Sequence, residues 1–342
     1  MLTSEFDYNL PTELIAQEAA PRGESRLLHV GSDGTFRHLQ ISDLPRLLAA
    51  GDLLVVNNTK VMPARLHAWR EATGGQVELL LVERLSETGW TALLKPGRRV
   101  RRGTRLLLAD GLGVEIREKL NDGRYRVQFS EPIEPHLESL GHVPLPPYIK
   151  RDDQPEDRAR YQTVFARFLG AIAAPTAGLH FSAELLESLH DAGVSLAELT
   201  LHVGIGTFKP VTTDLVHEHR MEAESYLVPA ETAEAICEVK REGGRIVAVG
   251  TTTVRTLETV AREHEGAIVE CEGTSDLFIT PGFPFQVVDL LLTNFHLPRS
   301  TLLMLVAAFA GRDRILEAYA EAIERRYRFF SYGDAMLLER PK

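Results

Sequence analysis

Short apolar runs that end in small polar residues recur along the chain and indicate an α/β fold. Arg245–Gly250 has the composition of a buried strand, and Thr251–Thr253 stands where the following helix begins. Asp52–Val56 is another such strand and ends in the doubled asparagine Asn57-Asn58. Further segments are helix-like: Ser42–Ala49, Ser182–Ala192, Ala230–Arg241, Thr301–Ala310 and Asp313–Arg326. Two more are expected as strands: Met221–Tyr226, with Glu222 and Glu224 on one face, and Asp276–Pro281.

The pattern changes between Arg65 and Phe129. The segments there are short, mostly β-patterned and separated by Gly-Gly, Pro-Gly, Asp-Gly and Asn-Asp-Gly turns. Such spacing, without a strong helical segment, is typical of a small antiparallel barrel. The α/β pattern resumes after the proline-rich segment Val143–Ile149, so we predict a barrel inserted at residues 62–149. The main α/β domain is then formed by residues 1–61 and 150–342.

Composition sets limits on the class of protein. A length of 342 residues with 44% hydrophobic and 25% charged residues is ordinary for a water-soluble enzyme. The longest apolar runs, such as Leu302–Ala310, are too short to cross a bilayer, and the N-terminus lacks a signal-peptide layout, so we expect a cytoplasmic protein without a membrane partner. With only Cys237 and Cys271, a disulfide framework and a four-cysteine zinc site are excluded. No H-E-x-x-H spacing occurs, and no metal site is predicted.

Charge is distributed unevenly along the chain. The net charge is −10, yet residues 60–126 contain fourteen Lys and Arg against eight Asp and Glu. The densest stretch combines Lys95 with Arg98, Arg99, Arg101, Arg102 and Arg105. Such a density suits contacts to a phosphate backbone, although a solvated basic hairpin has the same pattern.

Two loops are candidate walls of a ligand pocket, Ala173–Phe181 and Leu199–Phe208. Each joins an apolar run to glycine, threonine and histidine, and loops of this kind present N–H groups and side chains to ligands at the edge of an α/β sheet. The same glycines can simply make turns, and the histidines can simply cap strands. Thr251–Thr253 also has two interpretations. The free N–H groups at a helix start can bind an anion, or the threonines can act only as an ordinary helix cap.

No single motif fixes a reaction, because a G-x-S-x-G elbow, a P-loop and a G-x-G-x-x-G fingerprint are all absent. Six blocks together, however, closely resemble the S-adenosylmethionine:tRNA ribosyltransferase-isomerase family and occur in the family's order. They are Asn57–Arg65, Gly141–Ile149, Ala174–Phe181, His202–Phe208, Ala248–Arg255 and Thr293–Ser300.

The resemblance implies a bacterial enzyme of queuosine biosynthesis with a barrel-like α/β main domain and a small inserted β-barrel. Members transfer and isomerise the ribosyl part of S-adenosylmethionine onto a 7-aminomethyl-7-deazaguanine base at the tRNA wobble position. The product is epoxyqueuosine-tRNA, and adenine and methionine are released. S-adenosylmethionine is then a co-substrate, no cofactor is bound permanently, and a monomer is expected.

This chemistry assigns tasks to residues in the matching blocks. A base that removes the ribose C5′ proton next to the sulfonium, and an acid for adenine, are expected among His180, His202 and His296, with Asp289 as the carboxylate alternative. The methionine carboxylate is expected near Thr251–Thr253 and Arg255 or near Arg299, and the sulfonium or ammonium near Glu222 or Glu224. The full set of candidates for binding S-adenosylmethionine is Thr176, Gly178, Gly204, Gly206, Glu222, Glu224, Thr251, Thr252, Arg255 and Arg299.

For tRNA, we expect the arginines to contact phosphates and an aromatic residue, Phe330 or Tyr332, to stack on a splayed anticodon base. The arginines are Arg98, Arg99, Arg101, Arg102 and Arg105. Two other functions stay open at this point. A methyltransferase with the same co-substrate would release S-adenosylhomocysteine, and a non-catalytic RNA-binding protein would explain the basic segment alone.

Overall fold

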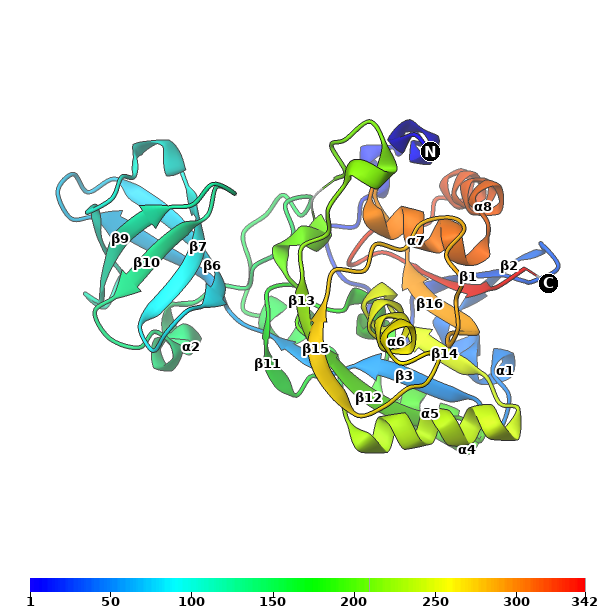
Figure 1. Cartoon of the computed structure of the whole chain (residues 1–342). Helices are drawn as coiled ribbons and strands as arrows, with labels where there is room; N and C mark the ends of the chain where they lie inside the picture. The colour runs from blue at the N-terminus through cyan, green and yellow to red at the C-terminus, as the bar shows by residue number, and fades with distance from the viewer. Residues whose placement is uncertain (209, 342) are drawn as a thin grey trace.

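The computed structural model describes residues 1–208 and 210–341, with the side chains of Arg99, Thr207 and Phe208 outside that description. It consists of a large mixed sheet covered by helices and a separate β-barrel (Figure 1). The sheet contains, in spatial order, β15 (Cys271–Ser275), β13 (Glu224–Val228), β12 (Ser195–Leu201), β3 (Leu53–Asn57), β14 (Ile246–Val249), β16 (Leu290–Asn294), β17 (Ala335–Glu339), β1 (Arg26–Val30) and β2 (Phe36–Gln40).

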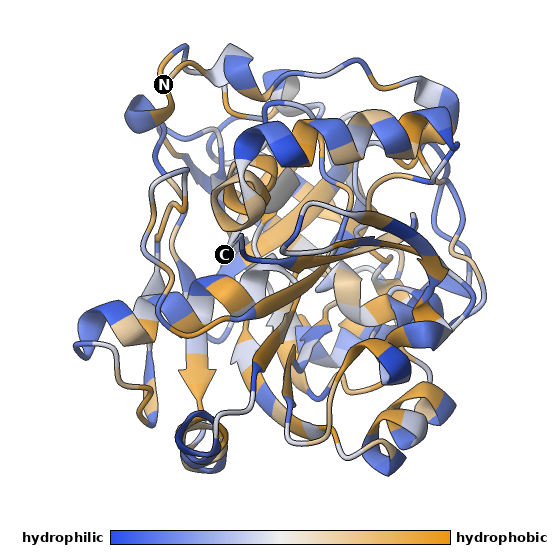
Figure 2. Ribbon diagram, turned by 90° about the vertical axis from the view of Figure 1, so that its right-hand side faces the viewer, coloured by the Kyte–Doolittle hydropathy of each residue, from blue (hydrophilic) through white to orange (hydrophobic). Residues whose placement is uncertain are grey.

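The four central strands β12, β3, β14 and β16 are parallel. β3 and β14 are buried along their whole length, as expected for parallel strands covered on both faces. Side chains alternate between two cores, so that Leu53 and Val55 pack on one face while Leu54 and Val56 pack on the other. Figure 2 shows these apolar strands in the middle of the view, with helices around them that are hydrophilic on one side.

Helices connect and cover the strands: α1 (Leu44–Leu47), α4 (Ala183–Asp191), α5 (Ala230–Glu242), α6 (Thr251–Glu263), α7 (Thr301–Ala310) and α8 (Arg312–Glu324). α7 is buried almost all round because its sequence is apolar on every side. α4 begins where the Ser182 hydroxyl accepts a hydrogen bond from the Leu185 N–H. Among the described residues, no helix has both the length and the apolar composition needed to span a membrane.

The inserted domain is a closed antiparallel barrel with its own hydrophobic core. Its strands are β5 (Arg65–Arg70), β6 (Gln76–Arg84), β7 (Gly89–Lys95), β8 (Arg105–Leu107), β9 (Gly113–Lys119) and β10 (Tyr125–Phe129). The short helices α2 (Leu137–Leu140) and α3 (Asp157–Arg160) lie on the return to the main domain, and β4 (Thr59–Val61) pairs with β11 (Phe168–Ala171) at the junction. In Figure 1 the barrel stands to one side of the sheet.

The predicted α/β class with an inserted antiparallel barrel is confirmed. The main sheet is open, because β15 and β2 are its edges in the described part of the chain, so the barrel-like closure implied by the resemblance is absent there. One strand prediction was wrong, and the start of another was placed too early. The edge strand ends at Ser275, before Asp276–Pro281, and β13 begins at Glu224, so that Glu222 lies outside it.

Candidate active site

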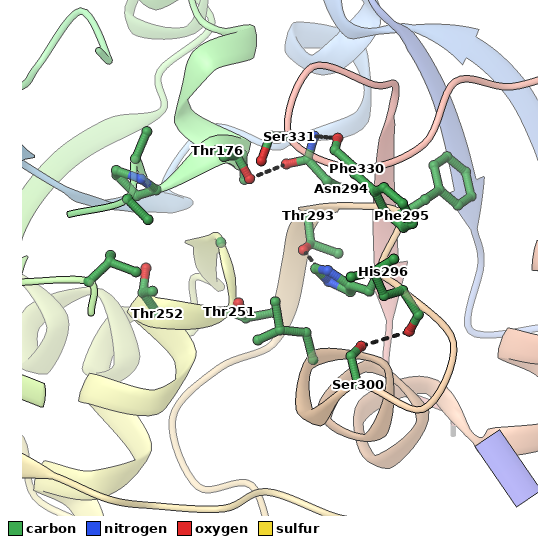
Figure 3. Close-up of a pocket in the computed structure, with 18 of the residues that line it drawn as sticks. Thr176, Thr251, Thr252, Thr293, Asn294, Phe295, His296, Ser300, Phe330 and Ser331 are labelled. Atoms are coloured by element: carbon green, nitrogen blue, oxygen red, sulfur yellow. Dashed lines mark hydrogen bonds between the residues drawn. The ribbon is translucent and has the colours of Figure 1, made fainter. Parts of the chain in front are cut away.

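The main pocket lies at the carboxyl edge of the four parallel strands. Figure 3 shows that its wall is made by loops that follow different strands. The empty space in and above it, part of which is open solvent, is about 650 Å³. The lining residues are Tyr148, Ala173–Ala177, Val203, Gly250–Thr252, Thr293–Leu297, Ser300, Leu302, Phe330 and Ser331.

Two helices begin at this pocket with their N-termini toward it. Gly250 precedes α6 with φ of 88°, a conformation that favours glycine, and no side chain caps the helix. Within the described residues, the N–H groups of Thr251, Thr252 and Thr253 have no hydrogen-bond partner. α7 begins at Ser300, whose hydroxyl accepts from the Leu303 N–H at 3.1 Å. The two positive helix ends make the pocket attractive to an anion.

Asn294 anchors the wall between the two helix starts. Its amide nitrogen donates to His180 Nε2 at 3.1 Å and to the Phe330 carbonyl at 3.1 Å, and its oxygen accepts from the Thr176 hydroxyl at 3.1 Å. Since His180 Nε2 is an acceptor here, its Nδ1 donates to Ser25 Oγ at 2.9 Å. His180 therefore stands behind the wall and holds Asn294 in position.

His296 is the one predicted histidine that lines the pocket itself. Its Nε2 lies 3.0 Å from the Thr293 hydroxyl, and its backbone N–H donates to the Tyr319 hydroxyl at 2.8 Å. Burial lowers the pKa of His296 to about 3. Burial, helped by the positive charge of Arg328, lowers the pKa of His180 to about 4. Both imidazoles are neutral at neutral pH because a buried charge is costly.

His202 and Asp289 lie outside the pocket. His202 Nδ1 is 2.8 Å from the Thr59 hydroxyl and its ring packs against Gly170, although the next residue, Val203, does line the pocket. Asp289 precedes β16 and therefore stands at the opposite edge of the sheet, where its carboxylate accepts from the Ile246 N–H at 2.9 Å and pairs with Arg340. Its predicted part in the chemistry does not fit this position.

Glu222 and Glu224, which were predicted to contact the sulfonium or ammonium, are also not among the residues that line the pocket. Glu224 is buried and forms an ion pair with Arg255, and its other oxygen accepts from the Gly204 N–H at 2.7 Å. The guanidinium of Arg255 is already engaged, because it pairs with Glu224 and donates to the carbonyls of Ser275 and Leu277. Glu222 lies beside Gly206, away from the lining residues. No Asp, Glu, Lys or Arg is among the described residues that line the pocket.

For two further candidates, Arg299 and Gly178, contacts within the protein account for the residue without a ligand. Arg299 pairs with Asp7 at the surface. Gly178 lies under Thr176 in a buried turn, and a Cβ there would come within 2.7 Å of the Phe165 ring, so this position is glycine because of close packing. Of the ten residues predicted to bind S-adenosylmethionine, the pocket brings together Thr176, Thr251 and Thr252.

The two aromatic candidates differ. Phe330 lines the pocket, with its ring centroid 4.9 Å from that of Tyr148. Tyr332 is buried away from the pocket, donates to Asp157 Oδ1 at 3.0 Å and packs edge-on against Tyr161, so it is not placed to stack on a base. On the barrel, Arg98, Arg101, Arg102 and Arg105 are exposed, and no carboxylate among the described residues forms an ion pair with them. The side chain of Arg99 lies outside the described residues.

Tyr148, Asn294 and Ser331 line the pocket but carried no predicted role. Tyr148 and Asn294 belong to two of the six matching blocks, Gly141–Ile149 and Thr293–Ser300, and that was the available signal. Ser331 follows the aromatic pair Phe329-Phe330 and had no signal of its own. Within residues 1–208 and 210–341, no group of three His, Cys, Asp or Glu side chains is arranged to hold a metal ion.

A neutral pocket at the carboxyl edge of an α/β sheet, with two helix N-termini and a buried histidine, is the kind of site that binds a small molecule with an anionic group. The model of the family described as queuosine biosynthesis protein matches residues 3–338. The chain belongs to this family.

Named relatives agree with that assignment. The S-adenosylmethionine:tRNA ribosyltransferase-isomerase of Carboxydothermus hydrogenoformans is 53% identical, and that of Thermotoga maritima is 52% identical, over 99% of this chain and 100% of each relative. The crystal structure of the S-adenosylmethionine tRNA ribosyltransferase from Thermotoga maritima superimposes with a TM-score of 0.55 and 43% identity, over 98% of this chain and 99% of that one.

Proposed function

We propose that this chain transfers and isomerises the ribosyl moiety of S-adenosylmethionine onto 7-aminomethyl-7-deazaguanine at the wobble position of tRNA. Adenine and methionine leave, and epoxyqueuosine-tRNA is formed. The observation that carries the proposal is the pocket itself, because it joins the free N–H groups of a helix N-terminus to a neutral cavity that is partly open to solvent. The names of the full-length relatives give the same two substrates.

The methionine carboxylate binds at the N-terminus of α6. Three adjacent N–H groups, those of Thr251, Thr252 and Thr253, face a space that no protein carbonyl or carboxylate occupies among the described residues. The helix dipole adds a positive potential there. Arg255 is committed to Glu224, so the backbone N–H groups take over the task that the arginine was expected to perform.

The sulfonium lies in a part of the pocket that has no carboxylate countercharge. This neutrality favours the chemistry, because an uncompensated sulfonium stabilises the carbanion that forms when C5′ loses its proton. His296 is the base. It is the one predicted histidine that lines the pocket, and the Thr293 hydroxyl, 3.0 Å from its Nε2, orients the imidazole.

The tRNA contacts the barrel through Arg98, Arg101, Arg102 and Arg105, which are exposed and unpaired with carboxylates in the described part of the chain. A tRNA substrate places the enzyme in the cytoplasm.

The test uses the whole protein, S-adenosylmethionine and an anticodon stem-loop that carries 7-aminomethyl-7-deazaguanine. We expect adenine and methionine in equal amounts, together with a heavier RNA, and no release with an otherwise identical stem-loop that has guanine at the wobble position. Formation of S-adenosylhomocysteine would instead identify a methyltransferase, and binding without release would identify a non-catalytic RNA-binding protein.

The assignment of His296 is tested by His296→Asn. We expect adenine release to fall about 100-fold or more, as for loss of a general base, with S-adenosylmethionine binding retained. His190→Asn serves as the control, because His190 is exposed on α4. Turnover of His296→Asn at the wild-type rate would contradict the assignment.

A further inference from the structure

Expulsion of adenine needs a proton donor as well as a base, and the histidines of the site are poor candidates for it. Their pKa values of about 3 and 4 leave His296 and His180 unprotonated at neutral pH. His180 is additionally fixed between Ser25 and Asn294. A group that is protonated in the resting enzyme and that lines the same pocket is the better candidate for the donor.

Tyr148 has the only phenol among the described residues that line the pocket, and a phenol is more acidic than the serine and threonine hydroxyls there. Tyr148 comes from the segment that returns from the barrel, and Ser331 from the segment before β17. Tyr148 Oη and Ser331 Oγ are 2.5 Å apart, and both residues line the cavity. The Tyr148 ring also packs against that of Phe330, with the two rings tilted by 51°, so the phenol is held beside a second aromatic ring of the pocket wall.

We infer that Tyr148 is the general acid that protonates the leaving adenine and that Ser331 is its positioning residue. The inference rests on the proposed function. Ser331 donates its hydroxyl hydrogen to Tyr148 Oη, and the phenol hydrogen is the one given to the ligand. The same bond from Ser331 stabilises the phenolate that remains.

The proton and electron balance is closed within the reaction. When the bond between the ribose C1′ and adenine breaks, its electron pair stays on adenine, and the Tyr148 proton moves to an adenine ring nitrogen. The amine of the tRNA base loses a proton when it bonds to the sugar, and that proton restores the phenol. Burial raises the pKa of Tyr148 to about 12, so the phenol carries its proton at neutral pH.

Tyr148→Phe removes the proton and keeps the ring. We expect adenine release to fall about 100-fold or more, with S-adenosylmethionine binding within twofold of wild type by calorimetry. Because the base acts before the acid, deuterium from heavy water should still enter C5′ of S-adenosylmethionine in this variant. Tyr226→Phe is the matched control, since Tyr226 is a buried tyrosine whose hydroxyl donates to Glu263 outside the pocket.

Ser331→Ala and 2,3-difluorotyrosine at position 148 keep the test decisive if Tyr148→Phe does not fold. We expect Ser331→Ala to slow adenine release about tenfold, and the fluorinated phenol, with its lower pKa, to move the alkaline limb of the kcat profile to lower pH. Wild-type adenine release by Tyr148→Phe, loss of deuterium exchange together with release, or an unmoved alkaline limb would each overturn the inference. Absence of adenine release from the wild-type enzyme would instead refute the proposed function.

Discussion

At the scale of single residues, the site depends on Asn294 more than on any charged group. Its side chain links three loops, because it donates to His180 and to the Phe330 carbonyl and accepts from Thr176. Phe330 has a φ of 71°, which is uncommon for a residue with a side chain, and the hydrogen bond from Asn294 holds its carbonyl in place. The pocket wall is therefore fixed by neutral hydrogen bonds.

Asn294→Ala would leave buried acceptors on His180 and Phe330 without a donor. We expect the free energy of unfolding to fall by about 2 kcal/mol, the usual cost of unsatisfied buried polar groups. Urea denaturation at pH 7 measures it, with Asn121→Ala, in an exposed turn of the barrel, as the control. A decrease no larger than that of the control would show that the network contributes little.

The buried histidines predict a pH dependence of stability. The pKa values of His180 and His296 are lowered by folding from 6.5 to about 4 and about 3. Below pH 6.5 the unfolded chain binds protons that the folded chain does not, so stability falls as the pH decreases toward 4. Each histidine costs about 2 kcal/mol at pH 5 relative to neutral pH.

Replacing one of these histidines should flatten this dependence. In His180→Gln we expect the difference in unfolding free energy between pH 7 and pH 5 to shrink by about 1 to 2 kcal/mol, even if the variant is less stable at both values. The measurement is urea denaturation at each pH. An unchanged difference would mean that His180 titrates alike in the folded and unfolded chain.

At the scale of elements, the site is made by the way helices follow strands. β14 leads directly into α6, and β16 leads through Asn294–Ser300 into α7, so both helices begin at the same edge of the sheet. Neither helix presents an acidic residue in its first turn, which leaves both N-termini positive. The anion site is thus a property of two strand–helix connections.

Thr251→Asp would place a carboxylate at the α6 N-terminus and compete with the ligand's own carboxylate. We expect the affinity for S-adenosylmethionine to fall about tenfold, or about 1.4 kcal/mol, and the affinity for 5′-methylthioadenosine, which has no carboxylate, to fall less. Calorimetry with both ligands checks this. Ala230→Asp, at the start of α5 and outside the pocket lining, is the control. Equal decreases for the two ligands would place the carboxylate elsewhere.

The predictability of these elements from sequence follows from their periodicity. Thr301–Ala310 was predicted at its true bounds, and the short β-patterned segments expected between Arg65 and Phe129 are the barrel strands, because apolar runs and glycine turns mark them. The edge strand β15 was missed because Cys271–Ser275 is only partly buried and has no apolar run.

The pocket loops were predictable for a different reason, since they follow apolar strands and end in small polar residues. Side-chain partners were not. Nothing in the spacing shows that Arg255 turns to Glu224, that Asp289 stands at the far edge of its strand, or that Tyr148 meets Ser331 across 183 positions. Such pairings depend on tertiary packing.

At the scale of the whole molecule, the segment by which the chain returns from the barrel to the main domain also reaches the pocket. Arg158 ties the base of the barrel to the main domain by donating to the carbonyls of Glu138 and Gly141, at 2.7 and 2.6 Å. The return segment Val143–Ile149, which lies between Gly141 and Arg158 in the sequence, places Tyr148 in the pocket wall. An RNA held on the barrel is therefore connected through a short segment to the site of chemistry.

The charge pattern of the barrel separates two sets of arginines. Arg98, Arg101, Arg102 and Arg105 are exposed without an ion pair to a carboxylate among the described residues. Besides the less exposed Arg65, which pairs with Glu78, four others on the same domain are paired with carboxylates: Arg84, Arg117, Arg124 and Arg126. An unpaired arginine keeps its full charge for a phosphate, whereas a paired one must first give up its partner, so only the first set should dominate RNA binding.

Changing the four unpaired arginines to glutamine tests this division, with the four paired arginines changed to glutamine as the control of equal net charge. Because each arginine that neutralises a phosphate releases condensed counterions, we expect the first variant to bind the stem-loop more weakly and to lower the slope of log affinity against log salt by about 0.7 for each phosphate that is no longer neutralised. The control should change the slope far less, and S-adenosylmethionine should bind both variants as it binds the wild type. Equal slopes in the two variants would show that net charge, and not the position of the unpaired arginines, attracts the RNA, and that the barrel contributes a diffuse field in place of a defined binding surface.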